Sequence, residues 1–539
     1  MSQSVKSPMS SSLVSRRVTR FAPFASLLAL AACSSVLGIE DLHQGPAPGS
    51  GGSSNGGSSN GGNAAMGGDG AVGATSGAST ISGGSGGKGQ GGSGGSTAIG
   101  GDTSVGGEAG AGIGAGGDGT IGGTTVHGHV IDYWQHKLAG VPVEIGGTKV
   151  ITDEAGAFTI DNVPSEYDAS LVVQFPDNYD GQIYGWVYQG LTRRDPTLQV
   201  YQGLQSQSGN VDVTPTGANV TLTGTRKMSV AFGGLDGSWE LSDVPAGGYD
   251  GSSVGWEGPT MTQETGHGLI WQPDPTTDAP TGYFAYDSKA VALNGLVSDH
   301  SALPLNMAAK TIPSGNITGT ITGNGTAART NGLFLQFTSN AVLTLVSDNG
   351  PNSFSYLVPT ITNSSVILAA SEGVGNAYDG AYGLVHKDGL AAGTSGITAT
   401  IPKPATLLTV TPATARNKVD GTTQFAFQPG AGSSGLFVIA FKDNDNSLLK
   451  TDALFIVTTK TSFTLPKVVN DSFALIPANK YFWRVETHGT FANADAATGP
   501  TGFIDEFGGD FYKATPSGPR RGSGSYTISG YSDVITMAP

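Results

Sequence analysis

The single cysteine of this 539-residue chain, Cys33, is its only nucleophilic sulfur. It directly follows an apolar run at residues 21–32, and Arg16, Arg17 and Arg20 precede that run. About 12 residues are too few to span a bilayer, which needs roughly 20, and the run ends in small residues. These features are typical of a cleaved secretory signal. A lone cysteine also means that the chain forms no internal disulfide and no cysteine-based metal site.

Leu30-Ala31-Ala32-Cys33 resembles the bacterial lipobox. The resemblance implies that the Cys33 sulfur is diacylated and that residues 1–32 are removed as a signal peptide, which leaves Cys33 as the lipidated N-terminus. The acyl chains would then attach the protein to a membrane. Ser34 stands where an Asp would favour retention at the inner membrane, so we expect a cell-envelope location at the outer membrane.

Three groups of side chains have residue types that bind metal ions, and each has a simpler explanation. His127-x-His129 places two imidazoles on one face of a strand, but zinc would need further ligands. Residues 443–447 begin like a calcium loop, yet Leu448 stands where an EF-hand needs glycine. The acidic residues within 505–510 fit an ordinary loop of an acidic protein. We therefore expect exposed histidines and solvated turns, and no metal site.

The tryptophans include the candidates for ligand binding, because flat aromatic rings can stack on sugar rings. Trp239 and Trp483 lie in core-like strand sequences and are expected to be buried. Trp256 and Trp271 lie in a part rich in glycine and proline and are the candidate stacking residues, although Trp271 could also be drawn into a short strand. No Ser-His-Asp set, zinc signature or phosphate-binding loop stands out. We predict no catalytic residues, no cofactor and no enzyme activity.

The charge of the chain argues against nucleic acid as a partner. The sequence has 27 basic and 42 acidic residues, a formal charge of −15. Removal of the signal takes away four basic residues and no acidic one, which leaves −19. Binding to nucleic acid depends on the neutralisation of phosphates by Lys and Arg.

Residues 44–125 consist almost entirely of Gly, Ser, Asn, Ala and Thr. Such a segment cannot bury enough apolar surface to offset the entropy of ordering it. As a flexible coil of roughly 80 residues it would have an end-to-end distance on the order of 50 Å. We predict that residues 33–125 are a lipidated N-terminus followed by a disordered Gly/Ser-rich linker.

From residue 126 onward the pattern changes to short alternating apolar and polar runs that are separated by Gly, Pro, Asn and Asp. Alternation with period two, with turn residues every 8 to 12 positions, is typical of half-buried antiparallel strands. No stretch keeps a helical period for three turns. The sequence therefore predicts an all-β fold made of tandem antiparallel β-sandwich domains.

The first part of this region contains several closely spaced motifs: Val126-x-Gly128-x-Val130, Gly140-Val141-x-Val143, Thr152-Asp153-x-x-Gly156-x-Phe158-x-Ile160-x-x-Val163-Pro164 and Tyr167. Over about 50 residues they resemble the carboxypeptidase regulatory-like domain, a transthyretin-like β-sandwich. The resemblance implies a folding or spacing module without catalytic residues. The residues themselves predict a hairpin turn from Asp153 to Gly156, with Phe158 and Ile160 on one face of the next strand.

A similar sequence recurs about 80 residues later, which indicates a repeat. Residues 156–164 and 237–245 share a glycine, an aromatic residue two positions on and a closing Val-Pro pair, so that Trp239 takes the place of Phe158. A weaker copy ends at Pro359. We predict three diverged sandwich units, at residues 126–216, 217–315 and 316–407.

The last part of the chain follows a different pattern. Residues 436–441 and 453–457 are apolar runs on either side of a polar turn, as in a hairpin. Together with residues 463–466 and 481–485 they resemble the later strands of a fibronectin type III-like sandwich. The resemblance predicts such a β-sandwich at residues 408–539.

These observations favour a non-enzymatic, lipid-anchored cell-envelope protein that displays its sandwiches for structural or adhesive contact with a surface glycan or protein. The predicted function, structural or adhesive contact, is inferred from the domain architecture alone. One alternative is a glycan-binding surface lipoprotein, which would need an exposed aromatic platform. A second is an envelope hydrolase, which would need a cleft with converging carboxylates.

Overall fold

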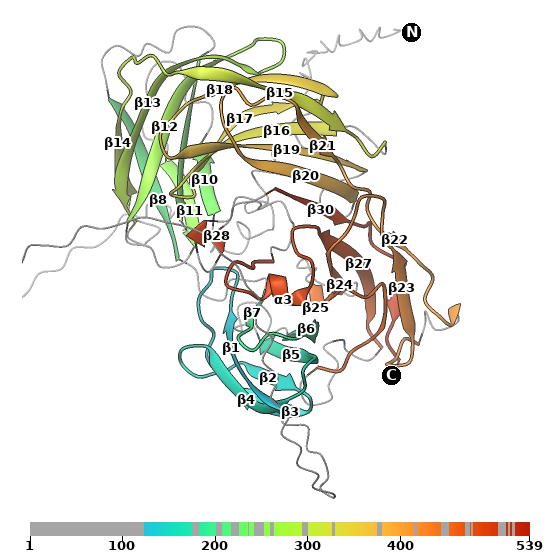
Figure 1. Cartoon of the computed structure of the whole chain (residues 1–539). Coiled ribbons are helices and arrows are strands. Elements are labelled where there is room, and N and C mark those ends of the chain that lie inside the picture. The colour runs from blue at the N-terminus through green and yellow to red at the C-terminus, as the bar shows by residue number, and fades with distance from the viewer. Residues whose placement is uncertain are drawn as a thin grey trace, which may run out of the picture. The chain divides into compact units, whose positions relative to one another are not determined.

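The computed structural model describes the β-rich part of the chain (Figure 1), namely residues 123–174, 183–200, 207–216, 226–234, 237–241, 253–258, 263–293, 300–325, 329–374, 380–413, 418–443, 452–468, 475, 478–504, 514–515, 518–519 and 523–538. Cys33 and residues 34–122 of the predicted linker lie outside these residues, and β1 (Thr124–Ile131) begins two residues before the predicted start of the first sandwich at residue 126. The described region is nearly all β, so the predicted fold class is confirmed.

The first seven strands form a two-layered group with one apolar core. One layer has the strand order β4-β1-β7, and the strands of the other follow the order β3-β2-β5-β6. The strands are β1 (Thr124–Ile131), β2 (Pro142–Ile145), β3 (Thr148–Ile151), β4 (Ala157–Val163), β5 (Tyr167–Gln174), β6 (Ile183–Leu191) and β7 (Thr197–Gln199). In β4, Phe158 and Ile160 are buried and Thr159 between them is exposed, as strand alternation requires.

The next seven strands form a second group, with layers β11-β8-β14 and β10-β9-β12-β13. Its strands are β8 (Gln207–Thr216), β9 (Lys227–Gly234), β10 (Gly237–Leu241), β11 (Ser253–Gly258), β12 (Gln263–Pro273), β13 (Pro280–Ala292) and β14 (His300–Asn306). The second group therefore begins at Gln207, ten residues before the predicted boundary at residue 217. Its apolar residues from both layers form a separate core.

A third group has layers β18-β15-β21 and β17-β16-β19-β20. Its strands are β15 (Ser314–Thr322), β16 (Arg329–Phe337), β17 (Val342–Asp348), β18 (Ser353–Pro359), β19 (Ser364–Val374), β20 (Ala381–Leu390) and β21 (Ile397–Thr400). Its core also includes Ala231, Leu269, Trp271 and Tyr283 of the second group, so the two groups share apolar packing.

All three groups share one strand order. In each, the first strand lies between the fourth, to which it is antiparallel, and the seventh, to which it is parallel. The second strand lies between the third and fifth, and the sixth follows the fifth. The groups are thus equivalent in topology, although each contains one parallel pair that the antiparallel expectation did not include.

One cross-strand pair recurs in all three groups. A glycine of the first strand lies opposite an aromatic residue of the fourth: Gly128 opposite Phe158, Gly209 opposite Trp256, and Gly319 opposite Phe354. Where side chains are described, the ring occupies the space that the glycine leaves. A Cβ atom on Gly128 would lie 2.2 Å from Cζ of Phe158, and one on Gly319 would lie 2.8 Å from Cζ of Phe354.

This register corrects two predictions. Trp239 does not take the place of Phe158, because it lies on β10, the third strand of its group, whereas Phe158 lies on a fourth strand. The residue opposite the equivalent glycine is Trp256. The turn from Asp153 to Gly156 does form, with Asp153 Oδ1 accepting bonds from two backbone amides, but it joins strands of different layers and makes no hairpin.

The C-terminal group has one layer in the order β22-β23-β26 and another that contains β25, β24, β27, β30 and β31. These are β22 (Thr406–Leu407), β23 (Gln424–Gln428), β24 (Leu436–Asp443), β25 (Asp452–Thr458), β26 (Ser462–Thr464), β27 (Lys480–His488), β30 (Gly524–Ile528) and β31 (Ile535–Thr536). The predicted hairpin is the antiparallel pair β24–β25. Between β27 and β30 lie α3 (Ala494–Ala497) and the short pair β28 (Ala514–Thr515) and β29 (Gly518–Pro519).

The four groups are not independent, because the C-terminal group pairs with the first and the third through backbone hydrogen bonds. β25 runs parallel to β6, and β30 runs antiparallel to β20 (Figure 1). The result is a single sheet in the order β17-β16-β19-β20-β30-β27-β24-β25-β6-β5-β2-β3, with β31 beside β27. Within the described residues, no helix is long and apolar enough to cross a membrane.

Candidate functional site

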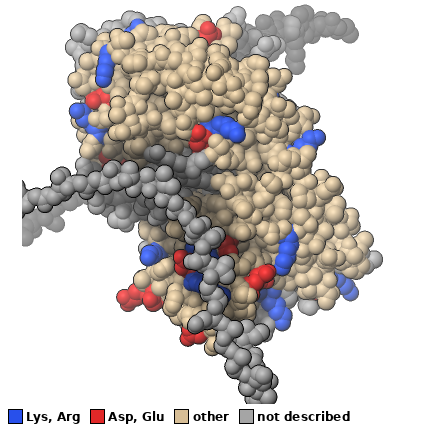
Figure 2. All heavy atoms as spheres, in the orientation of Figure 1, with Lys and Arg blue, Asp and Glu red and all other residues tan. Residues whose placement is uncertain are grey.

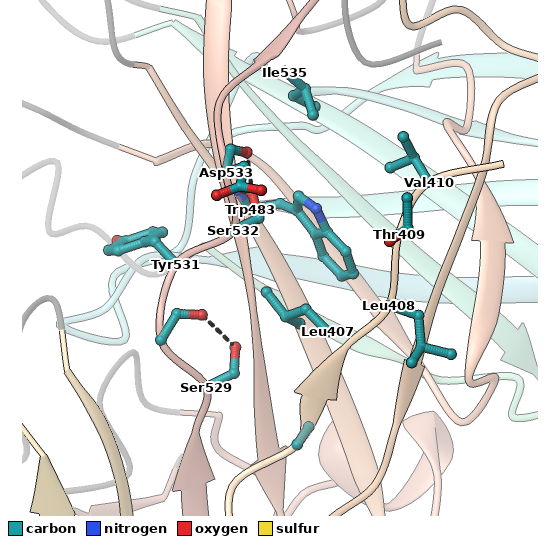
Figure 3. Close-up of a pocket in the computed structure, with 12 residues that line it drawn as sticks. Leu407, Leu408, Thr409, Val410, Trp483, Ser529, Tyr531, Ser532, Asp533 and Ile535 are labelled. Atoms are coloured by element: carbon teal, nitrogen blue, oxygen red, sulfur yellow. Dashed lines mark hydrogen bonds between the residues drawn. The ribbon is translucent and has the colours of Figure 1, made fainter. Parts of the chain in front are cut away.

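The candidate site is a pocket of about 320 Å³ in the C-terminal group. Residues 405–410, which include β22, form one wall, and residues 529–535 form the other (Figure 3). Trp483 of β27 lies between these walls. Since β22 pairs with β23 on its other side, the pocket separates two strand edges that do not pair with each other.

Two serines, Ser529 and Ser532, replace part of the backbone hydrogen bonding between β27 and residues 529–535, and this leaves room for the pocket. Ser529 N–H donates to the Val485 carbonyl at 2.8 Å, and Ser529 Oγ accepts the Val485 N–H at 2.9 Å. Ser532 does the same for Trp483, at 2.9 and 3.0 Å. Because side-chain hydroxyls take over these bonds, the intervening backbone can leave the sheet without leaving β27 amides unsatisfied.

The floor of the pocket is apolar and rigid. The Trp483 indole is only 1% exposed and meets the rings of Phe425 and Phe463 edge to face, with centroid distances of 5.5 and 6.1 Å. By contrast, the lining residue Leu408 is 46% exposed. An exposed apolar side chain at the edge of the pocket favours association with an apolar group.

Tyr531 lies on the other side of the 529–533 segment from the indole, as Figure 3 shows. Its hydroxyl accepts a bond from Arg484 Nη1 at 2.6 Å, and the ammonium of Lys442 lies 4.9 Å from its ring centroid. Arg484 in turn forms a buried ion pair with Glu486 at 2.9 Å. Tyr531 is thereby held in place, which fixes the wall of the pocket.

The chemistry of this pocket is that of non-covalent binding. Its described lining combines an indole, aliphatic side chains and hydroxyls, and Asp533 is the one acidic residue among them. Elsewhere the described charges are dispersed, and on the face that Figure 2 shows, acidic and basic side chains lie singly or in small mixed groups.

The structure corrects the prediction that Trp271 is a ligand-stacking residue. It lies in β12, is 3% exposed and donates from Nε1 to Ser229 Oγ at 3.0 Å, so it has no face for a ligand. The structure places Trp256 in β11, while its side chain lies outside the described residues. Trp134 and Trp186 are buried as well. None of the four tryptophans whose side chains are described offers an aromatic platform.

The candidate metal ligands do not come together in the described part of the chain. His127 is exposed and bonded to Thr159 Oγ1 at 3.1 Å, and His129 lies on the same face of β1. Asp443 ends β24, but the residues that follow it, and the acidic residues within 505–510, lie outside the described residues. No group of three or more His, Cys, Asp or Glu side chains that could hold a metal is found among the residues with described positions.

The sequence did not point to the pocket beside Trp483. Its walls are more than 100 residues apart in the chain, and the serines at 529 and 532 have no special neighbours. The only signal was the expected burial of Trp483, which is correct.

No family model matches the chain, and no curated protein matches it. Among solved structures it is similar in part to the Bacillus anthracis TIE protein, with 12% identity and a TM-score of 0.14 over 52% of this chain and 50% of that protein. The full-length major pilin SpaD from Corynebacterium diphtheriae shows 10% identity and a TM-score of 0.12 over 47% of this chain and 87% of the pilin. The shaft pilin SpaA from Lactobacillus rhamnosus GG shows 10% identity and a TM-score of 0.11, over 36% and 97%. The chain thus spans half the length of the TIE protein, and these likenesses assign no function.

Proposed function

We propose that the protein is a non-enzymatic, lipid-anchored component of the cell envelope, whose β-sandwiches make structural or adhesive contacts outside the membrane. Cys33 would carry the lipid, and residues 44–125 would separate the sandwiches from the membrane. The proposed location is the outer membrane, because Ser34, and not an Asp, follows the lipidated cysteine.

The observation that carries the mechanical part of this proposal is the long sheet. Backbone ladders join β6 to β25 and β20 to β30, so the first, third and C-terminal groups form one hydrogen-bonded body. Groups that are linked only by flexible segments would move independently. A body held together in this way can carry a load between an anchor and a contact surface without relative motion of its parts.

The strand orders support finer proposals for two groups. The first group combines a three-stranded and a four-stranded layer with the sequence motifs of a carboxypeptidase regulatory-like domain. The C-terminal group has β22-β23-β26 opposite β25-β24-β27 and a last strand, which supports a fibronectin type III-like assignment. Both assignments favour spacing and contact as the role.

The pocket beside Trp483 is our proposed contact point, since Leu408, which lines it, is one of the four exposed large apolar side chains among the described residues. A partner that inserts an apolar side chain beside Leu408 would cover it. The stacking hypothesis at Trp271 is not retained, because that ring is buried.

Fractionation of cells that express the full chain tests the anchor and the contact together. Cys33→Ala should move the protein from the detergent phase to the aqueous phase, prevent processing after Ala32 and abolish attachment of the cells to surfaces. Ser34→Ala is the matched control and should leave all three unchanged. Membrane partition that persists in Cys33→Ala would contradict the lipid anchor. Loss of the anchor with full attachment would contradict the adhesive role.

A further inference from the structure

A second cavity, of about 430 Å³, lies where the second and third groups meet. Strands β12 and β13 of the second group form one side. The other side consists of two turns of the third group, β16–β17 and β18–β19, together with residues 310–313 of the connection between β14 and β15. Lys310 N–H donates to the Phe284 carbonyl at 2.8 Å, which ties this connection to β13. The volume lies within the range of roughly 300 to 1,000 Å³ that small-molecule sites have.

At the centre of the cavity wall is His267 of β12, which bonds to both groups at once. Its Nδ1 lies 3.0 Å from the hydroxyl of Tyr286 in the second group, and its Nε2 lies 2.9 Å from Ser339 Oγ in the third. The imidazole stacks on Phe337, with ring centroids 3.8 Å apart. Tyr286 is also hydrogen-bonded to Ser288, so four side chains form one row across the junction.

All the hydrogen bonds of the row point in one direction, because a neutral imidazole has one donor and one acceptor nitrogen. Burial lowers the pKa of His267 from 6.5 to about 4, so at neutral pH one ring nitrogen donates and the other accepts. A directional row that begins at Ser288 and ends at Ser339 therefore has a free donor at one end and a free acceptor at the other. Both end residues line the cavity.

The remaining lining is rich in hydroxyls and carries one permanent charge. Threonines of both groups line it, namely Thr265, Thr338, Thr360 and Thr362. Among the described lining residues Lys310 alone is permanently charged, and no described carboxylate lines the cavity. In a chain of formal charge −15, this is a local reversal of sign.

We propose that this cavity binds one residue of an acidic polysaccharide, a hexuronate. A sugar ring has hydroxyls that must both donate and accept, and the row from Ser288 to Ser339 with the surrounding threonines offers both kinds of partner. The carboxylate pairs with Lys310, whose side chain is exposed, and Ile312 provides apolar lining beside it. The net negative charge of the rest of the protein repels an acidic polymer, so binding is confined to this cavity.

The test is a titration of the purified full-length chain in detergent with D-galacturonate. D-galactose, which has the ring hydroxyls but no carboxylate, and acetate, which has the carboxylate but no ring, are the comparison probes. Galacturonate should bind at least about tenfold more tightly than either, because a charge-assisted hydrogen bond adds to the neutral ones. Equal affinity for acetate would overturn the sugar, and equal affinity for galactose would overturn the acid.

Variants locate the binding. Lys310→Gln should lower galacturonate affinity about tenfold, to the level of galactose, and Lys403→Gln, an exposed lysine outside this cavity, should not. Ser339→Ala should weaken both sugars, and Ser355→Ala on the exposed face of β18 should weaken neither. If Ser339→Ala does not fold, Ser288→Ala tests the other end of the row. Unchanged galacturonate affinity in Lys310→Gln overturns the proposal.

Binding of a hexuronate in this cavity is a further activity beside the proposed structural role, and it does not depend on the lipid anchor. Cys33→Ala should bind galacturonate as the wild type does, so the two proposals fail separately.

Discussion

Replacement of Trp256 by alanine should destabilise the second group as strongly as Phe158→Ala destabilises the first. Trp256 lies opposite Gly209, as Phe158 lies opposite Gly128, and the two pairs occupy the same place in equivalent strand orders. The similarity in sequence makes a different prediction, because it gives this role to Trp239.

The magnitude follows from the described pair. Phe158 is 4% exposed, and its Cζ atom lies 2.2 Å from the position that a Cβ of Gly128 would take, so the ring lies directly on the glycine backbone. Truncation to alanine empties that space, and no side chain on Gly128 can refill it. Loss of a buried aromatic side chain costs about 3 to 5 kcal/mol. We expect the same range for Trp256→Ala.

Because the first, third and C-terminal groups share one sheet, and the second group shares an apolar core with the third, global unfolding would mix their responses, and a local measurement is required. Native-state hydrogen exchange of the full chain, read on peptides from β8 and β11, reports the second group, and peptides from β1 and β4 report the first. Trp256→Ala should speed exchange in β8 and β11 and leave β1 and β4 unchanged. Wild-type protection of β8 and β11 in Trp256→Ala, with loss in Trp239→Ala, would refute the assignment by register.

Three further changes test other parts of the structure. Gly319→Ala should lower the melting temperature, because its Cβ would lie 2.1 Å from the Ile397 carbonyl oxygen. Overpacking of this kind costs about 1 to 3 kcal/mol. The control is Gly282→Ala, whose Cβ would meet only a side-chain atom, at 3.3 Å. The lowered pKa of His267 contributes stability above pH 6.5 that is lost as pH falls towards 4, so thermal melts should show this loss in the wild type and less of it in His267→Gln. Ser529→Ala should cost about 1 to 3 kcal/mol in urea unfolding, because the buried Val485 amide loses its acceptor, and a Ser529→Thr variant should retain most of the stability.

The individual strands were predictable because alternation is local. Phe158 and Ile160 follow period two, and Asp153 has the side chain that a tight turn needs, so their positions could be inferred from neighbouring residues. The similarity between residues 156–164 and 237–245 misled for the same reason. A short strand that ends in Val-Pro has the same pattern whether it is third or fourth in its group, and only pairing with a distant strand distinguishes the two cases.

The candidate sites were less predictable because long-range pairing creates them. Trp271 could be buried or exposed according to its sequence, and the acceptor that fixes it, Ser229, lies on another strand. His267 has no distinctive neighbours either, and its importance arises only where Ser339 of the next group comes within 2.9 Å.

The position of the C-terminal group in the sheet has a consequence for biogenesis. β6 pairs with β25 and β20 with β30, and the first of these pairs joins residues about 270 positions apart, such as Gly185 and Leu454. A chain that is synthesised N-terminus first must therefore keep two strand edges open until its final segment has been made. Open edges recruit other strands, so premature termination anywhere before β25 would yield an aggregation-prone product instead of a shorter working protein. The last residues to be made therefore close the edges of strands that were made much earlier, and folding of the first and third groups is complete only when the C-terminal group is present.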